Sequence, residues 1–317
     1  MTADDVAEHA DSVLGEIERA VVTDEHFLQT ILSGVLAEGH VLLEDVPGTG
    51  KTLVARSFAE ALGLTFNRVQ FTPDLLPADI TGTEVYDEQT AAFEFVEGPV
   101  FANVVLADEI NRAPPKTQAA LLEAMEERQV TVSGETYDLP EPFFVIATQN
   151  PVEQEGTFPL PEAQVDRFML KSSMGYPDHE GERELIDRRL DRRTKDPSVD
   201  AVVSPDDVRA MQAEPEDVRV EEPVREYVVS LTRATRADRH VDVGVSPRGT
   251  QRFLEVCRAW ALLQGRDYVA PEDVKAVAPA ALAHRLVLTT EAEMQEASKR
   301  AIVEAVLDEV EVPAIAQ

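Results

Sequence analysis

A glycine-rich turn between an apolar segment and a helical one is the first place in this sequence where chemistry is expected. Residues 41–43 are apolar and run directly into the turn, which ends at Lys51 and Thr52. In a strand–turn–helix unit of this kind, successive backbone N–H groups face a phosphate at the positive end of the helix. Lys51 would reach the β- and γ-phosphates of a nucleotide, and Thr52 would hold Mg²⁺. The residues expected to bind the nucleotide are Pro47, Gly48, Thr49, Gly50, Lys51, Thr52 and Leu53.

This turn departs at one position from the P-loop pattern of nucleotide-binding proteins. The pattern has a glycine six residues before the lysine. Here that position is Asp45. The alternative interpretation is a glycine-rich turn between a strand and a helix, with an incidental lysine.

Two adjacent carboxylates favour the P-loop interpretation. An apolar segment, residues 104–107, ends in Asp108 and Glu109, about 57 residues after Lys51. A carboxylate at the end of a strand beside the P-loop can bind the Mg²⁺ shell, which is the role expected of Asp108. Glu109 can polarise a water molecule for attack on the γ-phosphate. The alternative, two acids that merely end a strand in an acid-rich protein, loses weight because a P-loop precedes them.

A third polar group follows another apolar segment. Residues 143–147 are apolar, and Asn150 comes shortly after them. An amide in this place can orient the attacking water between the phosphate and Glu109. The alternative is an ordinary turn formed by Asn150 and Pro151. Together the three segments predict binding and hydrolysis of Mg-ATP.

The elements that must hold these groups alternate between strands and helices. Helical periodicity covers residues 11–38, and further helices are expected over 53–62 and 116–128. Strands are expected at 41–43, 66–71, 103–106 and 143–147, and a hairpin at 129–139. Apolar strands that alternate with helices indicate an α/β domain whose parallel sheet is flanked by helices. We assign residues 1–177 to this domain.

The chain changes character after residue 177. The segments that follow have only helical patterns, and we assign residues 178–317 to an all-helical lid domain. Helices are expected at 180–193, 206–213, 222–237, 247–264, 271–284 and 291–309.

Acidic residues outnumber basic ones 60 to 29, for a net charge of −31. Such self-repulsion strains a compact fold in dilute buffer, and about 1 M salt screens it. The charge therefore predicts adaptation to a salt-rich cytoplasm, as in a halophilic archaeon; an acidic face for a basic partner is the alternative. It also argues against nucleic acid as a substrate. No apolar run is long enough for a membrane span. A cytoplasmic location is expected.

Cysteine and histidine provide little chemistry in this chain. The single cysteine, Cys257, allows no intrachain disulfide and lies in an apolar helical stretch, so a buried role is expected. The six histidines lack ligand spacing with one another and with Cys257. No metal site built from protein side chains is predicted.

On these motifs the chain resembles the AAA+ ATPases of the MoxR group from about residue 10 to its end. The resemblance rests on residues 44–52, 107–112, 147–151, 162–168 and 246–248. It identifies Lys51 and Thr52 with Walker A, Asp108 and Glu109 with Walker B, and Asn150 with sensor 1. Asp at the first P-loop position is familiar in this group.

The resemblance also implies roles for two arginines. Arg167 resembles the arginine finger that acts on the ATP of a neighbouring subunit, and Arg248 resembles sensor 2 in the lid. A guanidinium group can neutralise charge on the γ-phosphate in the transition state. The alternative for each is a surface salt bridge. Arg112 is a second candidate for a contact between subunits.

A finger supplied by a neighbour implies a homo-oligomeric ring, typically a hexamer in this family. Relatives carry inserted hairpins corresponding to residues 74–98 and 129–139, which line the pore in related motors; packing at the ring face is the alternative. The leading hypothesis is a remodelling or maturation factor for protein complexes, with a VWA-domain protein as partner. A helicase-type nucleic-acid motor and a nucleotide switch without useful turnover are the alternatives.

Overall fold

Five parallel strands form the central sheet of the protein, in the order β2-β5-β8-β1-β9. The structure, a computed structural model, describes residues 1–151 and 156–313. The strand β8 lies between β1, which leads into the P-loop turn, and β5, which bears the two carboxylates. The short strand β9 was not predicted. The strands are β1 (Val41–Glu44), β2 (Phe66–Gln70), β5 (Val104–Asp108), β8 (Phe144–Gln149) and β9 (Leu170–Ser172).

Both faces of this sheet are buried, which explains the continuous apolar segments of its central strands. Side chains alternate between the faces of a strand. In β5, Val104 and Leu106 pack into one apolar core, whereas Val105 and Ala107 pack into the other. The first core includes the helix α3 (Lys51–Ala61), and the second includes α5 (Pro115–Glu127). The expected parallel α/β fold is confirmed.

The helical periodicity of residues 11–38 belongs to two helices. The first, α1 (Ala3–Ala20), begins with a capping box formed by Thr2 and Asp5. The second, α2 (Glu25–Leu36), begins where the side chain of Asp24 accepts a hydrogen bond from the N–H of Phe27. An Asp at this position satisfies a backbone donor that has no partner within the helix, and it therefore fixes the break.

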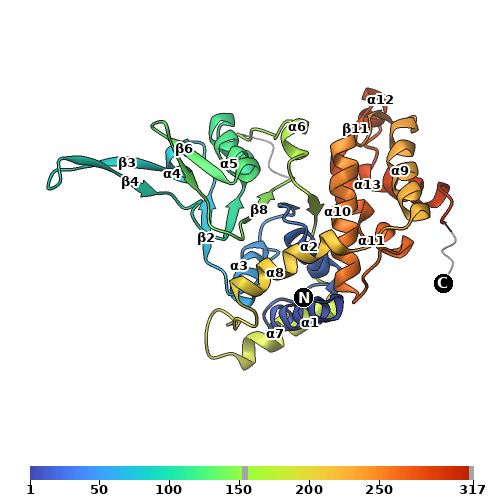
Figure 1. Cartoon of the computed structure of the whole chain (residues 1–317), viewed down its shortest axis with the longest axis horizontal. Coiled ribbons are helices and arrows are strands. Elements are labelled where there is room, and N and C mark those ends of the chain that lie inside the picture. Colours follow the sequence, from blue (N-terminus) through green and yellow to red (C-terminus); the bar gives the residue numbers. More distant parts are fainter. Residues whose placement is uncertain (152–155, 314–317) are drawn as a thin grey trace.

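Two hairpins extend from the α/β domain. The helix α4 and the strands β3 and β4 lie within residues 74–98, and the β3–β4 hairpin projects away from the sheet (Figure 1). The second hairpin, β6–β7, follows α5 directly. These elements are α4 (Pro77–Thr81), β3 (Gly82–Asp87), β4 (Ala92–Glu97), β6 (Gln129–Val132) and β7 (Glu135–Asp138).

The lid is helical, with one addition to the expected pattern. Two short antiparallel strands, β10 and β11, pair within it, and the single helix expected over residues 291–309 is two helices. The long helix α10 packs against α1 and α2, so the lid shares an apolar core with the N-terminal helices. The elements from residue 162 onward, apart from β9 and the 3₁₀ turns, are α6 (Glu162–Val165), α7 (His179–Asp191), α8 (Pro205–Ala213), α9 (Glu222–Ala237), β10 (Val241–Val243), α10 (Pro247–Leu263), α11 (Pro271–Leu282), β11 (Val287–Leu288), α12 (Thr290–Met294) and α13 (Lys299–Glu309).

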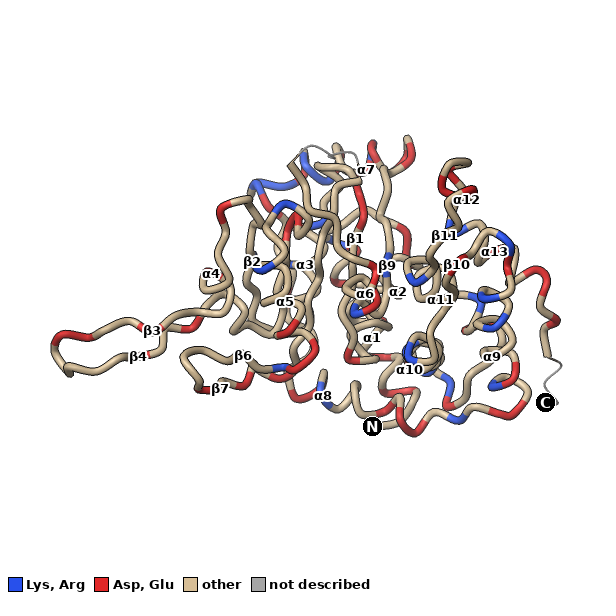
Figure 2. The backbone as a smooth tube through the Cα atoms, turned by 90° about the horizontal axis from the view of Figure 1, so that it is seen from above, with Lys and Arg blue, Asp and Glu red and all other residues tan. Residues whose placement is uncertain are grey.

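Acidic residues occur along the whole chain, from the projecting hairpin to the lid (Figure 2). They do not gather on one element, which fits a hydrated acidic surface better than a single acidic face. In the described ranges, no helix combines the length and apolar character needed to cross a membrane.

Candidate functional site

The turn between β1 and α3 has the backbone conformation of a phosphate-binding loop. Gly48 and Gly50 have φ angles of 89° and 102°, a region that side chains with a Cβ rarely adopt. Gly50 precedes the first residue of α3, Lys51, so the N-terminus of that helix faces the turn. The backbone therefore presents N–H groups and the positive helix end at one point, as an anion requires.

The ammonium group of Lys51 lies against the turn itself. Its Nζ donates to the backbone oxygens of Asp45 at 2.6 Å and Val46 at 3.0 Å. Partial burial lowers the pKa of Lys51, and the nearby carboxylates of Asp45, Asp108 and Glu109 oppose this effect. A triphosphate would provide stronger acceptors than the two carbonyl oxygens, because both partners of the hydrogen bond would be charged.

Asp45, the residue that departs from the P-loop pattern, holds the turn in place. Its buried carboxylate accepts hydrogen bonds from Ser173 Oγ at 2.7 Å, Met174 N at 2.7 Å and Gly175 N at 2.9 Å. These three residues follow β9, more than 120 positions later in the chain. A glycine would leave these donors without the carboxylate, so the aspartate ties the phosphate loop to the segment leading into the lid.

Asp108 lies at the carboxyl end of β5 and is held by two neighbouring strands. Thr148 Oγ1 on β8 donates to its Oδ1 at 2.7 Å. The guanidinium group of Arg68 on β2 donates to its Oδ2, from Nη2 at 2.6 Å and from Nε at 3.1 Å. These contacts hold the carboxylate of Asp108 in place beside the phosphate loop.

Glu109 has a left-handed backbone conformation, with φ 57° and ψ 49°. Its N–H donates to Thr148 Oγ1 at 2.8 Å, so the same hydroxyl group holds the Asp108 carboxylate and the backbone of Glu109. Its Oε2 accepts hydrogen bonds from Gln70 Nε2 at 2.7 Å and from Arg112 Nη1 at 2.9 Å. Arg112, a candidate for a contact between subunits, is therefore paired with Glu109 of its own chain.

These groups line one cavity of about 830 Å³, which we call the P-loop pocket. Lys51, Thr52, Asp108, Glu109 and Asn150 all border it, and Asn150 is buried at the end of β8. Basic residues from α3 and from α7 and the loop that follows it add positive charge. They are Arg56, Arg188, Arg192 and Lys195.

The oxygen donors of the P-loop pocket fit a magnesium ion. Mg²⁺ is typically bound through one or two protein oxygens together with the phosphates of the nucleotide. The hydroxyl group of Thr52 and the carboxylate of Asp108 border the same pocket. Within the described residues, no group of three or more His, Cys, Asp or Glu side chains is placed to hold a metal ion by itself. A metal ion held here would share its coordination between these two side chains and the phosphates of a nucleotide.

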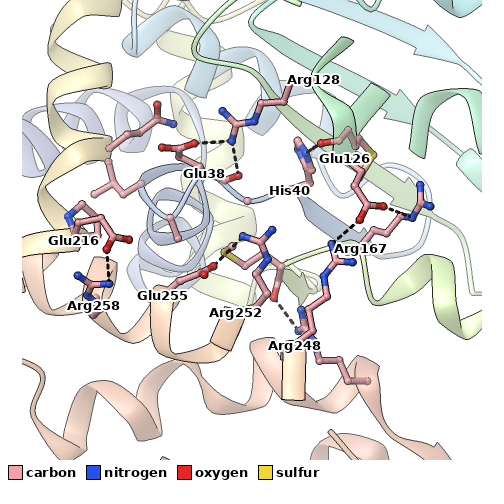
Figure 3. Close-up of a pocket in the computed structure, with 18 residues that line it drawn as sticks. Glu38, His40, Glu126, Arg128, Arg167, Glu216, Arg248, Arg252, Glu255 and Arg258 are labelled. Carbon is pink, nitrogen blue, oxygen red and sulfur yellow. Dashed lines mark hydrogen bonds and ion pairs between the residues drawn. The ribbon is translucent and has the colours of Figure 1, made fainter. Parts of the chain in front are cut away.

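Arg167 and Arg248 do not border the P-loop pocket of their own chain. They border a second cavity of about 430 Å³ between α2, α5, α10 and the turns around α8. We call it the arginine cavity because six arginines line it (Figure 3). These are Arg128, Arg167, Arg248, Arg252, Arg258 and Arg285.

Sequence reasoning missed several residues that the structure brings to these two places. Arg68 contacts the carboxylate of Asp108, and Gln70 contacts that of Glu109. The two residues are two positions apart in β2 and therefore lie on the same face of the strand. Two polar side chains at that spacing in a strand were an available signal. Thr148 and Glu126 gave no signal, because their partners are distant in the sequence.

Comparisons with known proteins agree with this geometry. The model of the family "ATPase family associated with various cellular activities (AAA)" matches residues 40–170, and an AAA lid domain model matches residues 233–306. The chain is 44% identical to Chaperone MoxR1 of Mycobacterium tuberculosis, over 95% of this chain and 81% of that protein. It is 47% identical to protein YeaC of Bacillus subtilis, over 94% and 92% of the two chains.

A solved structure extends the similarity to the whole fold. The crystal structure of a protein from Cytophaga hutchinsonii, described as a candidate ATPase, has a TM-score of 0.90 and 42% identity, and the match covers 98% of this chain and 97% of that one. Identity at this level over nearly the full length shows common family membership. The chain belongs to the MoxR family of AAA+ ATPases.

Proposed function

We propose that this protein hydrolyses Mg-ATP and works as an oligomeric ring that remodels or matures protein complexes. The observation that carries the proposal is the convergence of Lys51, Thr52, Asp108, Glu109 and Asn150 on one pocket. Membership of the AAA+ ATPases supports nucleotide binding. The name of the relative MoxR1, a chaperone, supports the remodelling role.

The residues of the P-loop pocket can divide the reaction among them. The turn and Lys51 would bind the β- and γ-phosphates, with Thr52 and Asp108 on the metal ion, which would neutralise phosphate charge. Glu109 would accept a proton from the attacking water, and Asn150 would orient that water. Gln70 and Arg112 both contact Oε2 of Glu109, so its other oxygen, Oε1, could receive the water without loss of these contacts.

The separation of the two cavities supports the proposed ring. Arg167 and Arg248 border the arginine cavity, so the P-loop pocket of a single chain lacks both cations. A second copy whose arginine cavity faces the P-loop pocket would supply them. We therefore propose that Arg248, like Arg167, acts on the nucleotide of a neighbour, in a ring that is a hexamer by family resemblance.

The client surface is proposed to include the two hairpins. Residues 74–98 contain seven acids and no Lys or Arg, and the β3–β4 hairpin exposes Tyr86 and Phe93. An acidic and aromatic hairpin is poorly suited to a phosphate backbone. A protein client fits this chemistry better, and a VWA-domain protein is the partner that the family resemblance suggests.

The test of this proposal is the specific ATPase activity measured against protein concentration, in high KCl with Mg²⁺. Activity per subunit that rises steeply and then reaches a plateau supports a site shared between subunits. Activity that is flat while sizing detects only monomers contradicts it. No activity at any concentration, with or without a client, would favour the nucleotide switch. Stimulation by single-stranded DNA would favour the helicase-type motor.

The client is tested by comparing pull-downs with wild type and with the variant Glu109→Gln. A protein partner retained by the variant in ATP, and released in ADP, supports the remodelling role. Absence of any ATP-dependent partner in the organism's own extract would remove its support.

Salt adaptation is a separate proposal that rests on the net charge of −31. The relatives named above are bacterial proteins, so the halophilic archaeal source that the charge suggests has no support beyond the charge itself. The melting temperature should rise as KCl increases from about 0.1 M to above 1 M, because screening removes self-repulsion. A melting temperature independent of KCl would contradict it.

A further inference from the structure

The arginine cavity contains one carboxylate that serves two arginines. Glu126 lies near the end of α5, and its Oε2 contacts Arg167 Nε at 3.1 Å. Its other oxygen, Oε1, contacts Arg248 Nη2 at 2.9 Å. Figure 3 shows the carboxylate between the two guanidinium groups, which come from different parts of the chain.

The other four arginines of the cavity each have a carboxylate that is separate from Glu126. The pairs are Arg128 with Glu38, Arg252 with Glu255, Arg258 with Glu216, and Arg285 with Asp166. Each of these pairs is neutral, whereas the triad of Arg167, Arg248 and Glu126 has a net charge of +1. Excess positive charge in the cavity is therefore concentrated on the two arginines that the proposed function assigns to a phosphate.

The ion pairs of the triad fix the positions of the two arginines and add little to the stability of the fold. The side chains of Glu126, Arg167 and Arg248 are 31%, 34% and 50% exposed, and ion pairs so accessible to water contribute little to stability. Arg167 is fixed at a second point, because its Nη1 donates to the backbone oxygen of Leu122 at 2.7 Å. Leu122 lies one turn before Glu126 on α5, so a single helix face holds this guanidinium group.

We propose that Glu126 is a positioning residue that holds Arg167 and Arg248 together as one cationic unit for the γ-phosphate of ATP bound to a second copy of this chain. The inference rests on the proposed function, since it assumes that both arginines act on a neighbour. Without the carboxylate, two like charges at this separation repel each other and long side chains become free to move. The contacts described use Nε and Nη1 of Arg167 and Nη2 of Arg248. As far as the described residues show, the other nitrogens of the two guanidinium groups could then contact phosphate oxygens.

The first experiment measures kcat and KM for ATP with Glu126→Gln at a concentration where wild type is fully assembled. We expect kcat to fall about tenfold while KM and the binding of a fluorescent ATP analogue stay unchanged, because the variant's own P-loop pocket is intact. The matched control is Glu255→Gln, which removes a carboxylate paired with a single arginine in the same cavity. Its kcat should stay within about twofold of wild type.

A triple variant and a mixing experiment separate positioning from a structural role. Glu126→Gln should cost nothing further when Arg167→Ala and Arg248→Ala are already present, whereas a structural effect would add to theirs. Mixing Glu126→Gln with Lys51→Ala should restore activity, because the second variant supplies intact arginines to the first. Glu126→Asp, which keeps the charge, should retain more activity than Glu126→Gln.

The outcomes distinguish this inference from the proposed function. If Arg167→Ala leaves turnover unchanged, the proposed function fails, and the inference fails with it. If Arg167→Ala abolishes turnover but Glu126→Gln does not reduce it, only the inference is overturned. Loss of activity that sizing traces to loss of assembly, or a lowered melting temperature with additive effects, also overturns it.

Discussion

The P-loop pocket and the arginine cavity differ in which charges they gather and in which elements supply those charges. In the P-loop pocket, the carboxylates of Asp108 and Glu109 border the same cavity as Lys51. Hydrogen bonds from neighbouring strands of one sheet hold these carboxylates in place. In the arginine cavity, Arg167 from the turn after α6 and Arg248 from α10 meet on the carboxylate of Glu126 in α5. The first place is a site that one chain can build. The second is a set of charges whose Arg167 and Arg248 do not border the P-loop pocket of the same chain.

The separation of the two cavities offers a way to prevent ATP turnover by an isolated subunit. The groups proposed to bind the nucleotide and activate water border one pocket, whereas the arginines proposed to stabilise the transition state border another. Under the proposed function, hydrolysis would depend on contact between two copies of the chain. The predictions below test whether the two cavities are in fact two halves of one site.

The largest effect is expected from Arg167→Ala. Loss of an arginine finger reduces turnover by about 10³-fold or more. Binding of a fluorescent ATP analogue to the variant should match wild type, since Arg167 does not border the P-loop pocket of its own chain. Turnover is measured as the rate of phosphate release, and binding of the analogue is measured by fluorescence titration.

Mixing provides the control for this variant. Arg167→Ala and Lys51→Ala are each expected to be inactive alone, and a mixture should recover part of the wild-type activity. If the mixture is as inactive as its components although sizing shows mixed rings, the two cavities are not two halves of one site.

A loss of about 10²-fold is expected from Glu109→Gln, the size associated with a missing catalytic base. The glutamine keeps an acceptor for Gln70 or Arg112 but cannot take a proton from water. Nucleotide should remain bound, so the variant should copurify with ATP rather than ADP. Normal turnover by this variant would refute the role of Glu109.

Acid should destabilise the protein through His40, which borders the arginine cavity. Its Nδ1 accepts from the N–H of Val145 at 3.0 Å and its Nε2 lies 3.0 Å from the oxygen of Met125, so the ring is neutral and Nε2 carries the hydrogen. Burial lowers the pKa of His40 to about 4. The unfolded chain, with an ordinary His pKa of about 6.5, binds more protons than the folded one, so stability falls as pH drops from about 6.5 to 4.

The difference in pKa corresponds to about 3 kcal/mol of stability at the acid end of this window. The measurement is urea unfolding at several pH values, with His40→Gln as the comparison. The variant should have a flatter dependence between pH 6.5 and 4. Equal slopes for the two proteins would show that His40 does not titrate as its burial implies.

The smallest effect is expected from Asp45→Asn. The amide can replace one acceptor oxygen but not the charge, and the donors of Ser173, Met174 and Gly175 then compete for it. The cost should be about 1–3 kcal/mol, the range for buried donors left without a full partner. Thermal unfolding measures it, and Asp74→Asn, at an exposed carboxylate in the hairpin insert, is the control. An equally small change in the melting temperature of both variants would contradict the structural role of Asp45.

Local patterns were sufficient for much of the fold. Strand β5 reads as a continuous apolar segment because both faces of the sheet are covered, and the helices α5 and α9 begin and end within a residue of their predicted limits. The exceptions have physical reasons. Asp24 caps a second helix inside one periodic stretch, and β9 is too short to have a period.

The sequence by itself determined the chemistry of the P-loop pocket, because each group there follows a strand and the carboxyl ends of parallel strands meet at one edge. It also determined the family, through motifs of fixed spacing. Only the tertiary structure decided which groups hold these residues: Arg68 on Asp108, and Ser173 on Asp45. It alone brought Arg167 and Arg248 to Glu126, away from the P-loop pocket. Such contacts join residues tens to more than a hundred positions apart, and no local pattern encodes which distant side chains will meet once two cores have packed.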